Sequence, residues 1–230
     1  MIIAIIILVI ILIAAAVILC GYTGIRIPVK KKEGVKRIAC VGDNITYGRS
    51  VMGCFFRAYP NILQKLRGES YQVGNFGVPG ATLQTTAEKP YSNSKAFAES
   101  IAFDPDIVLI MLGTNDAKDR NWRSEEHFAK QYVEFLERYS SLEKAPRIII
   151  CVPPYVTKPR NFLFSFTNKV DPEKMLQVVK SIKEVVVEQD AYAIDFNGIT
   201  KGSKQLFSLD GLNVNGEGAN IIAGVINKLM

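Results

Sequence analysis

Four short polar loops carry the residues of this 230-residue chain whose types and spacing could do chemistry. They read V-G-D-N-I-T-Y-G at 41–48, N-F-G-V-P-G-A-T at 75–82, G-T-N-D at 113–116 and D-G-L-N-V-N-G-E-G-A at 210–219. Each contains glycine together with polar side chains that can donate or accept hydrogen bonds. Such groups can bind a carbonyl or a sugar hydroxyl, and with a nucleophile and a base they can catalyse acyl transfer.

In this order the four loops resemble the signature blocks of the SGNH (GDSL-type) hydrolase family, over roughly residues 37–230. In that family the first block holds the serine nucleophile, and the second and third supply a glycine and an asparagine of the oxyanion hole. The last block holds the acid and the histidine base. The run M-L-G-T-N-D-A-K and the ending N-G-E-G-A-N-I-I-A are similar to the carbohydrate- and acetyl-esterase branch.

Carried onto this sequence, the resemblance assigns Gly80 and Asn115 to the oxyanion hole and Asp210 to the triad acid. The nucleophile position is Asn44 and the base position is Asn213. An amide is neither a useful nucleophile nor a proton acceptor, and loss of either triad group lowers turnover by about 10⁴ to 10⁶. We therefore expect a pseudoenzyme that binds an acylated sugar or cell-surface glycan, with a hydrogen bond joining the two amides.

Two other functions stay open from the residues. Asp43 or Asp210 could activate a water molecule, which would make the chain an esterase or deacetylase with altered catalytic residues. The domain could instead bind a protein partner in a membrane complex. Asp43 and Thr46 are candidates for the cleft, although Asp43 would also serve as an acceptor within its loop and Thr46 would cap or pack the turn. His127, the only histidine, lies in a charged stretch and is expected at the surface.

The loops follow apolar segments that must position them. Short runs rich in Val and Ile predict strands, and the amphipathic patterns between them predict helices. This alternation indicates an α/β fold, a flavodoxin-like three-layer sandwich with a mostly parallel five-stranded sheet. In such sheets ligands bind at the carboxyl ends of the strands. We expect strands at 37–41, 71–75, 106–112, 147–152 and 191–195, and helices at 60–66, 125–140, 172–188 and from 216 onward, capped by Asn215.

Residues 1–20 contain no charged side chain. A helix of that length spans about 30 Å, the hydrocarbon thickness of a bilayer. No basic segment precedes the run and no A-x-A-like cleavage site ends it, so an uncleaved single-pass transmembrane helix is expected rather than a signal peptide. The expected organisation is this anchor, a basic juxtamembrane linker at 21–36 and an SGNH hydrolase-like domain at 37–230, with the membrane as a partner.

The net charge of +6 lies mostly beside the expected anchor. There it can contact anionic lipid headgroups, and the near-neutral remainder indicates no nucleic-acid partner. The positive-inside rule favours a cytoplasmic domain. The resemblance to esterases of surface glycans favours the extracytoplasmic side, which we prefer. Between residues 21 and 40 a single acidic residue, Glu33, accompanies the basic ones, Arg26, Lys30, Lys31, Lys32, Lys36 and Arg37.

The sequence offers no ligand spacing for a metal ion and no phosphate-binding loop, so no cofactor is expected. The four cysteines are Cys20, Cys40, Cys54 and Cys151, and they form no spaced disulfide framework. Cys40 and Cys151 fall in apolar runs and are expected to be buried free thiols.

Overall fold

The computed structural model describes residues 5–12, 15, 25–159 and 169–230. Within these ranges five parallel strands form one sheet in the order β2-β1-β3-β4-β5. The chain moves outward from β1 to β2 and then returns to the other side of β1, so the loops after β1 and β3 open at the switch point of the sheet. The strands are β1 (Lys36–Gly42), β2 (Tyr71–Gly77), β3 (Ile107–Met111), β4 (Arg147–Val152) and β5 (Tyr192–Asp195).

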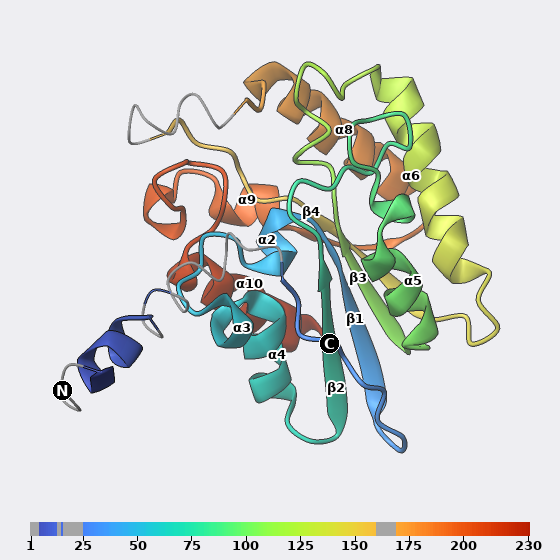
Figure 1. Cartoon of the computed structure of the whole chain (residues 1–230). Helices are drawn as coiled ribbons and strands as arrows, with labels where there is room; N and C mark the ends of the chain where they lie inside the picture. Colours follow the sequence, from blue (N-terminus) through green and yellow to red (C-terminus); the bar gives the residue numbers. More distant parts are fainter. Residues whose placement is uncertain (1–4, 13–14, 16–24, 160–168) are drawn as a thin grey trace.

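Helices cover both faces of the sheet, which gives the three-layer α/β sandwich predicted from the sequence (Figure 1). One face packs against α5, α6 and α8, and the other packs against α4 and α10. The longer helices are α4 (Tyr59–Arg67), α5 (Lys95–Ala102), α6 (Glu125–Ser140), α8 (Pro172–Glu188) and α10 (Gly216–Leu229). The short ones are α2 (Asn44–Tyr47), α3 (Cys54–Arg57), α9 (Phe196–Thr200) and the 3₁₀ turns η1 (Tyr91–Asn93) and η2 (Lys204–Leu206).

Alternate residues of β1 supply the two cores. Ala39 and Val41 pack with α5, α6 and α8, whereas Ile38 and Cys40 pack with α4 and α10. Because both faces of the sheet are covered at its centre, β3 and β4 are apolar almost throughout, and this is why their runs could be recognised in the sequence. Cys40 and Cys151 are buried free thiols, which confirms that prediction.

The long elements begin and end close to their expected bounds. For β4, α6 and α8 the agreement is complete, and Asn215 caps α10 as expected, its Oδ1 accepting from two backbone N–H groups. β2 continues past its expected end to Gly77. Helix α5 was not expected from the sequence, although Ser94 caps it.

The expected transmembrane segment, residues 1–20, falls largely outside the described residues. Residues 5–12 are helical and their apolar side chains are exposed. Over the ranges described above, no helix combines the length and apolar character that crossing a membrane requires. The first part of the expected linker, residues 21–24, also lies outside these ranges, whereas residues 25–35 are described and lead into β1.

Candidate functional site at the carboxyl end of the sheet

The turn after β1 presents Asn44 at the carboxyl edge of the sheet. Asp43 caps α2, since its Oδ1 accepts a hydrogen bond of 3.0 Å from the Ile45 N–H. Thr46 is fully buried, and its hydroxyl oxygen lies 3.2 Å from that of Tyr59. Thr46 therefore packs inside the turn, whereas the Asn44 side chain meets the neighbouring glycine loop.

Asp43 is a buried carboxyl group with an altered proton affinity. Burial raises the pKa of Asp43 to about 7, although the Ile45 N–H and the charge of Lys118 act in the opposite direction, and nearby Asp116 adds to the rise. Its second oxygen, Oδ2, accepts from Asn115 Nδ2 at 3.2 Å. A carboxyl group with this pKa has the proton affinity of a general base, but here both of its oxygens accept hydrogen bonds from the protein.

The loop after β2 brings Gly80 against Asn44. The Gly80 N–H donates a short hydrogen bond to Asn44 Oδ1. Gly80 has a φ of +79°, in the left-handed region that favours glycine. Asn44 is only 7% exposed. The backbone donor that the sequence assigned to an oxyanion hole is thus occupied by an amide oxygen of the same chain.

Asn115, in the loop after β3, is also fully engaged. Its Nδ2 donates to Asp43 Oδ2 at 3.2 Å and to the Ala81 carbonyl at 3.1 Å, which uses both amide hydrogens. Its Oδ1 accepts from Lys118 Nζ at 2.7 Å. The sequence argument did not single out Lys118, whose only signal was its place three residues after Asn115 in the same turn.

Asp116 ties the loops after β2 and β3 together. It is fully buried, and its carboxylate accepts from the backbone N–H groups of Leu83 and Gln84, each at 2.9 Å. Burial raises the pKa of Asp116 above its ordinary value, and these hydrogen bonds work against the rise. Asp116 is therefore the link that fixes one loop against the other.

The fourth loop carries Asp210 and Asn213 as a hydrogen-bonded pair. Asn213 Nδ2 donates to Asp210 Oδ2 at 2.6 Å, and the Asn213 backbone N–H donates to Asp210 Oδ1 at 2.9 Å. The loop is attached to the end of β4, because the Thr157 N–H donates to the Gly211 carbonyl at 2.7 Å. Asp210 therefore orients Asn213 in the way that an acid orients a base in a catalytic triad.

The hydrogen bond expected between the Asn44 and Asn213 side chains is not formed. Asn44 Oδ1 accepts from Gly80 instead, and Asn213 Nδ2 donates to Asp210. Asn213 Oδ1 is buried and has no hydrogen-bond partner in the described part of the chain. The Gly80 N–H binds the Asn44 amide oxygen, and the Asp210 carboxylate binds the Asn213 amide nitrogen. These two contacts take the place of the expected pairing between the amides.

Two direct hydrogen bonds connect the loops at the ends of β1, β2 and β3. Gly80 donates to Asn44, and Asn115 donates to Asp43. His127 lies elsewhere, on α6, where its Nε2 is 3.3 Å from the Thr86 hydroxyl at the protein surface. Across the ranges that the structure describes, no group of three His, Cys, Asp or Glu side chains is placed to hold a metal ion.

The sequence matches the model of the GDSL-like lipase/acylhydrolase family over residues 40–221, a range that includes all four loops. The chain belongs to this GDSL-like family. An acetylxylan esterase of Xylanibacter ruminicola is 28% identical over 217 residues, which are 87% of this chain and 44% of that protein. The chain thus spans less than half the length of this curated relative.

Solved structures of the GDSL-like type have the same fold. A carbohydrate acetylesterase family member from Sinorhizobium meliloti has a TM-score of 0.68 at 20% identity, covering 85% of this chain and 97% of that one. A lipase/acylhydrolase from Enterococcus faecalis has a TM-score of 0.66 at 21% identity, covering 85% and 95%. At these identities the likeness establishes the SGNH hydrolase fold of the GDSL-like chain described here.

Proposed function

We propose that this GDSL-like protein is a membrane-anchored pseudoenzyme that binds an acylated carbohydrate and does not hydrolyse it. Asn44 stands in the turn after β1, where the first signature block of the family carries its serine, and Asn213 stands where the last block carries its histidine. Acyl transfer needs a hydroxyl group and a base that can deprotonate it, and these two amides provide neither.

The observation that carries the proposal is the contact between Asn44 and Gly80. The Gly80 N–H donates to Asn44 Oδ1, so a substrate carbonyl oxygen would have to displace that amide oxygen in order to reach the donor. The hydrogens of Asn115 Nδ2 are likewise taken, by Asp43 and by the Ala81 carbonyl. Oxyanion stabilisation requires donors that are free and already oriented toward the developing charge, and in this arrangement the donors of Gly80 and Asn115 are occupied.

Ligand binding is supported by two amide atoms that make no hydrogen bond within the described part of the chain. Asn213 Oδ1 is a buried acceptor without a hydrogen bond, and none of the hydrogen bonds of the described residues uses Asn44 Nδ2 as a donor. A sugar hydroxyl both donates and accepts, so it suits a site that offers one group of each kind. The names of the relatives, an acetylxylan esterase and a carbohydrate acetylesterase, favour an acylated sugar.

The proposed anchor is the uncharged run at residues 1–20. An acylated cell-surface glycan would be met outside the cytoplasm, and we therefore place the domain on that side of the membrane. The basic residues after the run favour the opposite orientation under the positive-inside rule, although large domains translocate largely regardless of flanking charge.

Calorimetry on the full-length chain with an acetylated xylo-oligosaccharide tests this function, together with an assay for released acetate. We expect binding without acetate release, and about 5- to 30-fold weaker binding for Asn213→Leu, because that change removes a buried acceptor. Asn220→Leu, on the exposed side of α10, is the matched control and should bind normally. Acetate release at enzymatic rates, or equal binding by the chain and Asn213→Leu, would contradict the proposal.

One observation favours the alternative of an esterase with altered residues. The pKa of Asp43, raised to about 7 by burial, suits a group that takes a proton from water near neutral pH. In that case the native chain would release acetate with a rate that rises through pH 7, and Asp43→Asn would abolish it. Against this alternative stands the geometry, since Asp43 is 1% exposed and both of its oxygens are engaged.

A further inference from the structure

The chain before β1 is attached to the domain instead of hanging free. The Gln72 side chain on β2 holds two of its backbone groups, since its Nε2 donates to the Lys30 carbonyl at 2.6 Å and its Oε1 accepts from the Lys32 N–H at 2.8 Å. Gln72 is only 8% exposed, so this clamp is shielded from water. We call residues 25–33 the strap.

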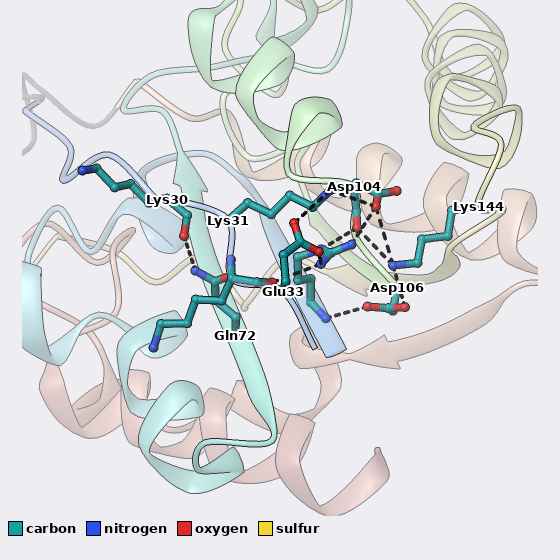
Figure 2. A network of polar contacts seen from close by, with 9 residues as sticks. Lys30, Lys31, Glu33, Gln72, Asp104, Asp106 and Lys144 are labelled. Atoms are coloured by element: carbon teal, nitrogen blue, oxygen red, sulfur yellow. Dashed lines mark hydrogen bonds and ion pairs between the residues drawn. The ribbon is translucent and has the colours of Figure 1, made fainter. Parts of the chain in front are cut away.

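Ion pairs fix the strap further. Figure 2 shows Lys31 reaching Asp104, with a distance of 3.4 Å between Nζ and Oδ2, while Arg37 at the start of β1 pairs with the same carboxylate at 2.6 Å. Nearer its beginning, Arg26 forms a short ion pair with Glu99 on α5. At its first residue the Ile25 carbonyl accepts from the Tyr47 hydroxyl at 2.8 Å. The strap is therefore held along its length.

These contacts change how the basic cluster beside the anchor can act. Arg26, Lys31 and Arg37 are three of its six cations, and each is paired with a carboxylate of the domain. Two carboxylates, Glu99 and Asp104, offset part of this charge, which leaves less of it for anionic headgroups. A membrane contact at this end of the molecule must therefore depend more on apolar side chains than the composition suggested.

Such side chains are present where the strap begins. Four large apolar residues in the strap and in the segment of α3 are about 60% exposed: Ile25 at 63%, Ile27 at 58%, Met52 at 59% and Phe56 at 63%. We call them the α3 face. The two segments lie together, because a cavity of about 270 Å³ is lined both by Ile25 and Ile27 and by Phe55 of α3. Exposed apolar groups gathered in this way mark an interaction surface more often than isolated ones do.

We propose that the α3 face rests on the lipid surface of the bilayer that holds residues 1–20. Only residues 21–24 separate that apolar run from Ile25, and four residues span at most about 14 Å when fully extended. Because the strap is fixed to the domain, its first residue stays within that distance of the end of the anchor. Lys30 and Arg57 are exposed beside the same segments and suit the headgroup layer. This inference rests on the proposed anchor and is independent of the loss of catalysis.

Tryptophan fluorescence of the full-length chain in vesicles of phosphatidylcholine and phosphatidylglycerol, with and without brominated acyl chains, tests the contact. The variants are Phe56→Trp and, as the control, Leu176→Trp on α8. Leu176 is also 63% exposed, but α8 packs on the other face of the sheet from α4, the neighbour of α3. The unchanged chain gives the background from Trp122.

We expect brominated lipid to quench the introduced tryptophan at position 56 about twofold or more strongly than the one at position 176, as befits a side chain inserted about 5–10 Å into the interface. Equal quenching at the two positions in a chain that floats with the vesicles would overturn the α3-face contact and leave the anchor standing. A chain that does not float with the vesicles would overturn both. Neither result bears on acetate release, so this failure is distinguishable from a failure of the pseudoenzyme proposal.

Discussion

Asn44 combines two effects in one side chain. It lacks the hydroxyl group that acyl transfer requires, and its Oδ1 accepts the hydrogen bond of the Gly80 N–H. A serine at this position would place its shorter side chain differently and leave that donor available to a substrate. The replacement, as we interpret it, therefore removes the nucleophile and also fills part of the space in which the transition state would be stabilised.

Asp43 predicts a pH dependence of stability. Burial raises its pKa in the folded protein from an ordinary 3.8 to about 7, so between these values the folded state binds more protons than the unfolded state. The free energy of unfolding should then fall as pH rises from about 4 to about 7, by roughly 2–4 kcal/mol, and Asp43→Asn should flatten the slope. Buried Asp116 contributes with the same sign.

Urea unfolding of the full-length chain at several pH values, followed by fluorescence, measures this slope. Asp119→Asn is the control, because the Asp119 side chain is 82% exposed. A slope unchanged by Asp43→Asn would show that the Asp43 carboxyl group is ionised in the folded protein across this range.

The structure joins residues of the signature loops by hydrogen bonds, but which residues pair could not be read from the sequence. Asn44 and Gly80 are 36 positions apart, and whether one side chain reaches the other depends on loop conformations that no periodicity encodes. The same holds for Asn213, whose preference for Asp210 over Asn44 is decided by a charge-assisted hydrogen bond of 2.6 Å.

At the scale of elements, the positions of the site residues depend on how closely α2 approaches β2. Gly77 is the contact point, because a Cβ there would lie 2.2 Å from the Tyr47 backbone nitrogen. Backbone atoms cannot rotate away as a side chain can, so α2 and Asn44 would have to shift. We expect Gly77→Ala to lower the free energy of unfolding by about 1–3 kcal/mol or more.

Gly224 is the matched control for this prediction. It lies on the exposed side of α10, and a Cβ there would meet no atom within 4 Å. Gly224→Ala should therefore stabilise the protein by up to about 1 kcal/mol, because alanine favours a helix. Thermal unfolding of both variants checks the pair, and a tolerated Gly77→Ala would contradict the close approach of α2 to β2.

Helices and strands with a clear hydrophobic period could be predicted from the sequence, whereas the short helices could not. The patterns of β4, α6 and α8 run for six to seventeen residues and agree with the structure at both ends. Helices α2, α3 and α9 have only four or five residues, so their formation depends on capping and tertiary packing more than on a repeat. Of these short elements α2 carries Asn44 of the site, which explains why the geometry there needed the structure.

Over the whole molecule, the strap connects the site-bearing domain to the end of the proposed anchor. The sequence shows residues 21–36 as a polar, basic stretch of the kind that often forms a linker. Its contacts with Gln72, Asp104 and Glu99 come from β2, from the turn after α5 and from α5 itself. Pairings over such distances along the chain follow from the fold, and a local pattern does not reveal them.

The central claim is that the family scaffold is intact and that the two asparagines account for the loss of chemistry. The most direct test is acetate release from an acetylated xylo-oligosaccharide by the full-length chain and by Asn44→Ser/Asn213→His. The account predicts that the native chain releases no acetate at enzymatic rates and that the double variant releases acetate at least about 10²-fold faster. The reason is that Gly80 is freed and Asp210 can orient a base. Hydrolysis by the native chain that equals or exceeds that of the double variant would contradict it.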